Sequence, residues 1–189
     1  MTAMVRMLDV SANNHTDDQP IDWKKVKGGG YGAVMIKATE GVGYANPWLK
    51  PDADGATSAG LSVGFYHFAH PGNDAPLAEA VWALSVVRGL HHDLGLALDL
   101  EVTEGLSWGA LKHFAQVFHG RIRTEFEHSP LYCNDYFLNG LAHAPWGWRV
   151  WLAQTDRPRR AVWAWQETTP ADIPGIVGGV DVGWLHPDA

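Results

Sequence analysis

The sequence predicts an α/β fold, a closed β/α barrel of the TIM type with about eight strands and fewer helices. Short apolar runs alternate with longer segments of helical periodicity, a rhythm typical of a largely parallel sheet. About eight such runs can be counted, the number of strands that closes a barrel in this class. No repeat, low-complexity tract or linker divides the chain, so we interpret residues 1–189 as one domain.

The elements follow from hydrophobic periodicity. The expected strands are Val5–Val10, Ala33–Ala38, Ser62–Ala69, Gly95–Glu101, Pro130–Asn134, Arg149–Gln154, Val162–Gln166 and Gly179–Val182. The expected helices are Asp22–Lys27, Trp48–Ala59, Ala75–Arg88 and Ser107–Glu127. In the last of these, Ser107 is a suitable N-cap, and an apolar stripe recurs at helical spacing at Leu111, Phe114, Ala115, Phe118 and Ile122. After Asn134 the intervals shorten and prolines recur, so we expect the helices to be concentrated in the first half.

Composition excludes several classes of protein. The formal net charge of -7 argues against a nucleic-acid partner, which requires a basic stripe. The one basic cluster, Arg157–Arg160, is short, contains a proline and is interpreted as a solvated loop. Cys133 is the single cysteine, so no intrachain disulfide can form. We find no apolar run of membrane-spanning length and no signal sequence near the start, so we expect synthesis in the cytoplasm.

Acidic residues recur at the ends of the expected strands. Asp99 and Glu101 are spaced i, i+2 at the end of the apolar run that begins at Leu94, so on a strand they point to the same face. Asp9, Glu40 and Asp181 lie at or in three other strands. Because parallel strands of a barrel end at one rim, we expect these five acids to converge there.

Paired acids in a cleft are the groups that glycosidic-bond hydrolysis needs. One acid must stay protonated to donate to the leaving oxygen, and the other must stay ionised to support the developing positive charge. Glu101 has the longer reach and the outermost position, so we expect it to be the proton donor. We expect Asp99 and Asp9 to be the stabilising or orienting carboxylates.

Aromatic residues on the other strands offer faces on which sugar rings could stack. The candidates are Tyr66, Tyr132, Trp151 and Trp165, the last of which directly precedes Gln166. For each of these aromatic residues, packing in the core is an equally good interpretation.

A series of short motifs carries a family resemblance when taken together. In order they are Leu8–Ser11, Ile21–Trp23, Ile36–Gly41, Gly64–Ala69, Leu98–Glu101, Trp151–Gln154, Trp165–Gln166 and Val180–Val182. In this order and spacing the chain resembles glycoside hydrolase family 25, the Chalaropsis-type lysozymes that are common among bacteriophage endolysins. Two stretches depart from the family pattern. The loop Ser11–Pro20 is longer than usual and lacks the aromatic-Gln-Gly sequence, and glycines flank Asp181 in place of more typical polar residues.

The resemblance implies a flattened, irregular barrel and N-acetylmuramidase activity on peptidoglycan, with cleavage of the β-1,4 bond between N-acetylmuramic acid and N-acetylglucosamine. It implies that Glu101 is the acid, Asp99 its partner, and Asp9 and Asp181 further active-site carboxylates. It also implies that Tyr66, Tyr132 and Trp151 line the groove, where we add Glu40, Trp165 and Gln166 as substrate-binding candidates. No metal or organic cofactor is implied. We expect a monomeric phage endolysin that acts on the cell wall after a separate pore protein, a holin, has opened the membrane.

Three alternatives stay open at this point. A metal-dependent hydrolase could use His67, His70, His91 and His92 with the acids, although residues at i, i+3 on a strand face opposite sides. A non-catalytic peptidoglycan-binding or phage structural module could use the same barrel. For the hydrolase, the sequence leaves open whether hydrolysis is inverting, retaining or assisted by the 2-acetamido group of the substrate.

Overall fold

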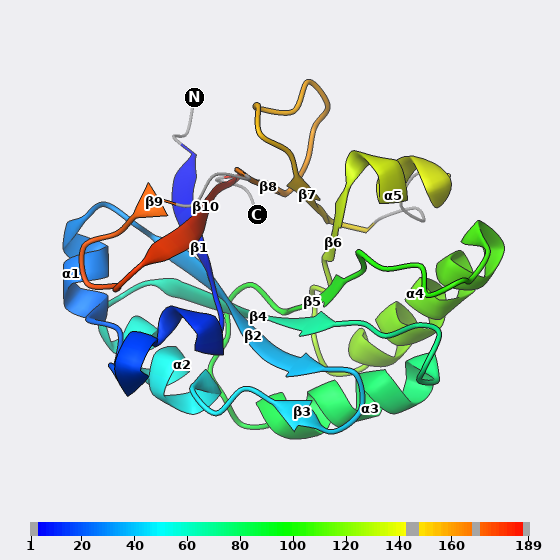
Figure 1. Cartoon of the computed structure of the whole chain (residues 1–189), viewed down its shortest axis with the longest axis horizontal. Coiled ribbons are helices and arrows are strands. Elements are labelled where there is room, and N and C mark those ends of the chain that lie inside the picture. The colour runs from blue at the N-terminus through cyan, green and yellow to red at the C-terminus, as the bar shows by residue number, and fades with distance from the viewer. Residues whose placement is uncertain (1–3, 143–147, 168–170, 187–189) are drawn as a thin grey trace.

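A computed structural model describes residues 4–142, 148–167 and 171–186, and its core is a closed eight-stranded barrel (Figure 1). The strands hydrogen-bond in the order β1-β10-β8-β7-β6-β5-β4-β2, and a further pairing of β1 with β2 closes the ring. These barrel strands are β1 (Val5–Val10), β2 (Ala33–Glu40), β4 (Ser62–Phe68), β5 (Leu96–Asp99), β6 (Leu131–Asn134), β7 (Val150–Ala153), β8 (Ala164–Gln166) and β10 (Gly179–Leu185). The two short strands β3 (Tyr44–Ala45) and β9 (Ala171–Asp172) pair with β2 and β10. The predicted barrel and its strands are confirmed.

The last barrel strand runs in the opposite direction from the expected one. β10 pairs antiparallel with both β1 and β8, whereas the other ring neighbours pair in parallel. A parallel return needs a long crossover, usually a helix, and the short segment between β8 and β10 contains only the β9 pairing among its described residues. The expectation that all the acidic strands end at one rim is therefore wrong for β10, which brings Asp181 to the rim near its beginning.

Helices cover the half of the barrel that comes first in the sequence. They are α1 (Trp23–Gly28), α2 (Leu49–Ser58), α3 (Pro76–Val87) and α4 (Trp108–Ile122). Figure 1 shows α2, α3 and α4 on the outer side of β2, β4 and β5, across the barrel from β7 and β8. The Ser107 hydroxyl accepts a hydrogen bond from the Ala110 amide, which caps α4 as expected.

Beyond residue 134, the described residues include one helix that the sequence analysis did not predict. This helix, α5 (Asp135–Gly140), follows β6 directly, and the Asn134 side chain caps it by accepting from the Phe137 amide. Two 3-10 turns, η1 (Ala12–Asn14) and η2 (Thr16–Asp18), shape the long loop after β1.

Apolar side chains form two separate clusters, one on each side of the barrel wall. The outer cluster lies between strands and helices and includes the α4 stripe, whose five members are all buried. The inner cluster fills the barrel with Met7, Ala33, Met35, Tyr66, Leu94, Ala97, Tyr132, Trp151, Trp163, Ala164 and Leu185. Side chains therefore fill the barrel, so a ligand can bind only in a shallow site at its rim.

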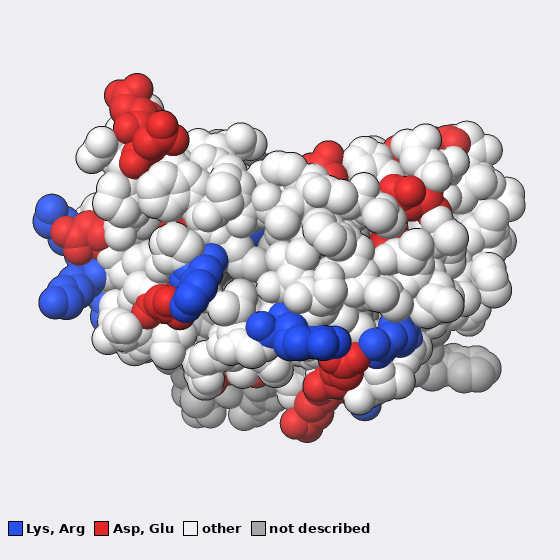
Figure 2. Space-filling view, turned by 90° about the horizontal axis from the view of Figure 1, so that it is seen from below, with Lys and Arg blue, Asp and Glu red and all other residues white. Residues whose placement is uncertain are grey.

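Charged side chains are mixed on the face in Figure 2, where Lys and Arg lie beside Asp and Glu and form no continuous basic stripe. Across the described ranges, no helix has the length and apolarity that a membrane crossing requires.

Candidate functional site

Four of the predicted acids meet at one rim of the barrel. Asp9 on β1 is the register partner of Asp181 on β10. Asp99 ends β5, and Glu101 lies two residues further along. Charges act between these carboxyls: that of Asp181 raises the pKa of Asp9 and Glu101, and that of Glu101 raises the pKa of Asp99. The structure therefore brings together residues that are far apart in the sequence.

Asp99 and Glu101 form a hydrogen-bonded carboxyl pair. Asp99 is buried and Glu101 half-buried. Burial and then the charge of Glu101 raise the pKa of Asp99 well above its usual range, and the hydrogen bond to Glu101 raises it further. Burial also raises the pKa of Glu101, while the hydrogen bond from Asp99 acts in the opposite direction. The interaction between the two carboxyls thus raises the pKa of Asp99 and lowers that of Glu101, so the protonated form is favoured more strongly at Asp99.

Asp9 is held by two donors. The Tyr66 hydroxyl and the Gln166 amide both hydrogen-bond its carboxyl. Burial raises the pKa of Asp9 to about 7 even though both hydrogen bonds lower it. The amide nitrogen of Gln166 also donates to Asp181 Oδ2 at 3.3 Å, so one buried side chain links the two acids.

Three predicted aromatic residues lie together beneath the acids. The Trp151 ring lies 4.4 Å from the Tyr132 ring and 6.1 Å from the Tyr66 ring, centroid to centroid. Burial and the neighbouring acids raise the pKa of both tyrosines, which keeps their hydroxyls neutral. Trp151 is only 1% exposed, so it supports the tyrosines from below and has no open face for a sugar ring.

Trp165 lies away from the site. Its ring stacks on Trp184 with centroids 6.0 Å apart, and the Arg157 guanidinium lies 5.7 Å above it. Gln166 is buried beside the acids, and successive residues of a strand face opposite sides. Gln166 and Trp165 therefore do not both reach the site, and the structure places Trp165, a predicted substrate-binding residue, apart from the acids.

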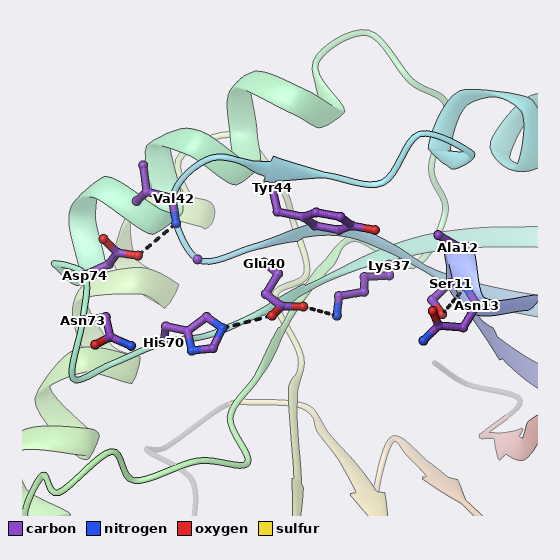
Figure 3. Close-up of a pocket in the computed structure, with 11 residues that line it drawn as sticks. Ser11, Ala12, Asn13, Lys37, Glu40, Val42, Tyr44, His70, Asn73 and Asp74 are labelled. Atoms are coloured by element: carbon purple, nitrogen blue, oxygen red, sulfur yellow. Dashed lines mark hydrogen bonds and ion pairs between the residues drawn. The ribbon is translucent and has the colours of Figure 1, made fainter.

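A cleft of about 480 Å³ lies between the loop after β1, the end of β2 and the loop before α3, and none of the four acids lines it (Figure 3). It is lined by Ser11, Ala12, Asn13, Lys37, Glu40, Gly41, Val42, Tyr44, His70, Asn73 and Asp74. Within it, Lys37 Nζ lies 2.5 Å from Glu40 Oε2, and Glu40 Oε1 lies 3.0 Å from His70 Nε2. Lys37 joins the cleft to the acids, because its charge partly opposes the rise that burial causes in the pKa of Asp99 and Glu101. The volume is within the range of small-molecule sites.

Three residues of this region were missed as functional candidates. Lys37 could have been noticed, because a lysine inside an apolar strand is unusual. His70 was considered only as a metal ligand. Glu104, which bonds His70 Nδ1 at 2.6 Å, lies in an irregular loop with no periodic pattern to reveal it.

The histidines of the metal alternative do not converge. His67 is buried between Thr39 and Glu79 and stacks on Phe118 of α4, on the outer side of the barrel wall. His70 lies at the rim, bonded to Glu40 and Glu104. In the ranges that the structure describes, no group of three or more His, Cys, Asp or Glu side chains is placed to hold a metal ion.

Comparisons with known proteins find a matching family and several relatives. The sequence profile described as glycosyl hydrolases family 25 matches residues 8–176. The autolytic lysozyme of Clostridium acetobutylicum is 44% identical over 87 residues, which are 46% of this chain and 26% of that relative. This chain covers less than two thirds of the length of the curated relatives that it matches.

Solved structures show the same barrel. The bacterial lysozyme from Streptomyces coelicolor superposes with a TM-score of 0.84 at 26% identity, over 98% of this chain and 94% of that one. The catalytic domain of the endolysin ply40 from bacteriophage P40 of Listeria monocytogenes superposes with a TM-score of 0.83 at 23% identity, over 100% of this chain and 96% of that one.

Proposed function

Because the chain belongs to glycosyl hydrolases family 25, we propose that it is a peptidoglycan hydrolase of the lysozyme type. Its reaction is the cleavage of the β-1,4 bond between N-acetylmuramic acid and N-acetylglucosamine. The observation that carries this proposal is the Asp99–Glu101 carboxyl pair, in which burial raises both pKa values, beside the carboxyls of Asp9 and Asp181 at the barrel rim. Such a pair supplies the acid and the anion that glycosidic hydrolysis requires.

The roles follow from burial and charge. Glu101 is the more exposed of the pair and is the proton donor to the leaving oxygen. Its proton comes from Asp99 across their hydrogen bond, which leaves Asp99 negatively charged beneath the sugar as positive charge develops at the anomeric carbon. Asp9 and Asp181 complete the anionic rim, and the Tyr66 hydroxyl orients Asp9.

The cleft accommodates the adjoining part of the glycan strand. It offers an exposed aromatic ring, Tyr44, close to charged and amide side chains such as Glu40 and Asn73. A ring face next to planar hydrogen-bonding groups suits a pyranose, which has an apolar face and a rim of hydroxyls. We assign Glu40 and Tyr44 to contact with a sugar ring of the glycan strand.

The decisive experiment is mass spectrometry of bacterial walls digested with the protein. A new reducing end on N-acetylmuramic acid supports the muramidase. A new reducing end on N-acetylglucosamine would indicate a glucosaminidase, and released peptides would indicate neither. Walls that remain intact while the protein still binds them would favour the alternative, a non-catalytic binding module on the same barrel.

The biological role that we propose is host lysis as a phage endolysin. Support comes from the barrel itself, which the endolysin of bacteriophage P40 also uses for its catalytic domain. An endolysin of this kind acts from the cytoplasm with a separate pore protein. Expression in a bacterium with a sensitive wall should therefore cause lysis with a co-expressed pore protein and little lysis without one, and equal lysis in both cultures would contradict this role.

A further inference from the structure

The His70 ring lies between two carboxylates from different segments. Its Nδ1 is 2.6 Å from Glu104 Oε1, and its Nε2 is 3.0 Å from Glu40 Oε1 (Figure 3 shows the second contact). Burial raises the pKa of both glutamates, but hydrogen bonds outweigh it and the net pKa of each is lowered. Both are therefore ionised at neutral pH and can only accept hydrogen bonds, so both ring nitrogens must donate and His70 must carry a positive charge.

The surroundings favour this charge. From β2, Glu40 and Lys37 face this region, and Glu104 comes from the loop between β5 and α4. From α3, the Glu79 carboxylate accepts a hydrogen bond from the His70 backbone amide at 3.0 Å, and Asp74, in the loop before α3, lies beside His70 against Gly41. Among these groups around His70, the carboxylates thus outnumber the one lysine, Lys37. The hydrogen bonds to Glu104 and then to Glu40 raise the pKa of His70.

Glu104 anchors the loop that carries Glu101. Its backbone φ is +46°, a left-handed conformation that a glutamate seldom adopts. Its carboxylate accepts hydrogen bonds from His70, from the Gly72 amide at 2.7 Å and from Asn73 Nδ2 at 3.1 Å. These bonds tie residues 100–106, which include Glu101, to the loop between β4 and α3.

Glu40, the other carboxylate bonded to His70, is linked to the acids through Lys37. Glu40 also binds Lys37 Nζ at 2.5 Å, and the charge of Lys37 acts on Asp99 and Glu101. The residues Glu40, His70 and Glu104, which we call the His70 bridge, therefore connect the cleft to the catalytic pair from both sides.

We propose that charged His70 is a positioning residue for the reaction: through Glu104 it fixes the loop that carries Glu101, and through Glu40 it fixes Lys37. The inference rests on the proposed hydrolase function. A neutral ring can donate to only one of the two glutamates and turns a lone pair toward the other. Loss of the proton therefore breaks one of the two hydrogen bonds between His70 and the glutamates. We expect the turnover rate to fall as the pH rises through the pKa of His70.

The kinetic test compares kcat and KM across pH 5 to 9 for the parent protein, His70→Gln and His113→Gln. His113 is an exposed residue of α4 and is the matched control. We expect His70→Gln to lower kcat about tenfold at pH 6, since small misplacement of catalytic groups costs one to two orders of magnitude. The change in KM should be smaller. The ratio of parent to variant kcat should shrink toward 1 at alkaline pH, where the parent also loses the bridge, and the control ratio should stay near 1 throughout. A ratio for His70→Gln that is the same at every pH would overturn the inference.

A second measurement does not depend on activity. Nitrogen NMR of the histidine rings should show both His70 nitrogens protonated at pH 6.5, with a pKa above the usual value of about 6.5. Glu104→Gln should move that pKa back down. A singly protonated His70 at pH 5.5 would exclude the bridge. If the protein cleaves no walls at any pH, the proposed function is refuted, and the NMR result alone tests the His70 bridge. If it cleaves walls but the ratio of parent to His70→Gln kcat is the same at every pH, only the positioning role is refuted.

Discussion

Asp9 and Asp181 face each other across an antiparallel strand pair, and the amide of Gln166 hydrogen-bonds both. β1 and β10 thus each deliver one carboxylate to the same place, and β8 delivers the group that separates them. Two ionised acids at this distance repel each other, so the amide between them stabilises the arrangement. The rim of the barrel thus holds two pairs of carboxyls: Asp99 with Glu101, and Asp9 with Asp181, which the Gln166 amide bridges.

Replacement of the proposed proton donor tests the central role. Glu101→Gln should lower the rate of wall lysis by about 10² to 10⁴, because a positioned general acid contributes that much. Folding and wall binding should be retained, since the side chain is half-buried and the amide is close in shape. Turbidity loss of a wall suspension measures the rate, and co-sedimentation measures binding. The control is Glu125→Gln, at a surface ion pair with Arg121, which should lyse walls at the parent rate. If Glu101→Gln also lyses walls at the parent rate, Glu101 is not the proton donor.

The Tyr66 hydroxyl should set the acidic side of the pH profile. Its hydrogen bond lowers the pKa of Asp9, which burial otherwise raises to about 7. In Tyr66→Phe this support is lost, so the pKa of Asp9 rises further and a smaller fraction of the protein carries ionised Asp9 at a given pH. We expect kcat to fall more at pH 6 than at pH 8, with the acidic limb displaced to higher pH. A uniform loss across the pH range would show that the hydroxyl acts on something other than Asp9.

Asp9 should weaken the fold at neutral pH. Its folded pKa of about 7 exceeds the ordinary pKa of an aspartate, 3.8, so between these pH values the native state holds a proton that the unfolded state has lost. The free energy of unfolding therefore falls as the pH rises from about 4 to 7, and Asp9→Asn should remove this loss.

The expected gain at pH 7.5 is about 1–4 kcal/mol, the upper end being the full pKa difference at 1.36 kcal/mol per unit. The gain should vanish below pH 4, and the variant should be inactive. Urea unfolding at both pH values makes the measurement, and a gain of equal size at pH 3.5 would contradict the assignment to ionisation.

Trp165 should affect stability without affecting catalysis. It stacks on Trp184 on the outer side of the barrel, away from the acids. Trp165→Phe should lower the melting temperature through lost packing and leave the KM for wall fragments unchanged. Tyr44→Ala in the cleft is the matched comparison, because its exposed ring should contribute to KM and little to stability. A raised KM in Trp165→Phe would show that the substrate reaches the outer face.

Much of this architecture is predictable because it depends on local periodicity. β1 begins and ends at the expected residues, and the α4 stripe is buried as its spacing predicts. The direction of β10 is not predictable in this way, since strand polarity depends on partners that are distant in the sequence. The alternation rule that puts Asp99 and Glu101 on one face also separates Trp165 from Gln166.

The network around His70 shows what local patterns cannot reveal. Glu40, His70 and Glu104 come from three separate segments, and each is an ordinary polar residue in the sequence. Only the closed barrel brings these segments together. A lysine in an apolar strand, by contrast, was a visible anomaly, and Lys37 is the residue through which this network reaches the acids.

The pairing of β1 with β10 has a consequence for synthesis. Asp9 lies on the first strand of the barrel to be translated, but the opposing strand that carries Asp181 is the last. The ring cannot close, and the reactive constellation cannot assemble, before that late segment is free to fold. Nascent chains should therefore be harmless to the cell wall until translation of the barrel is complete.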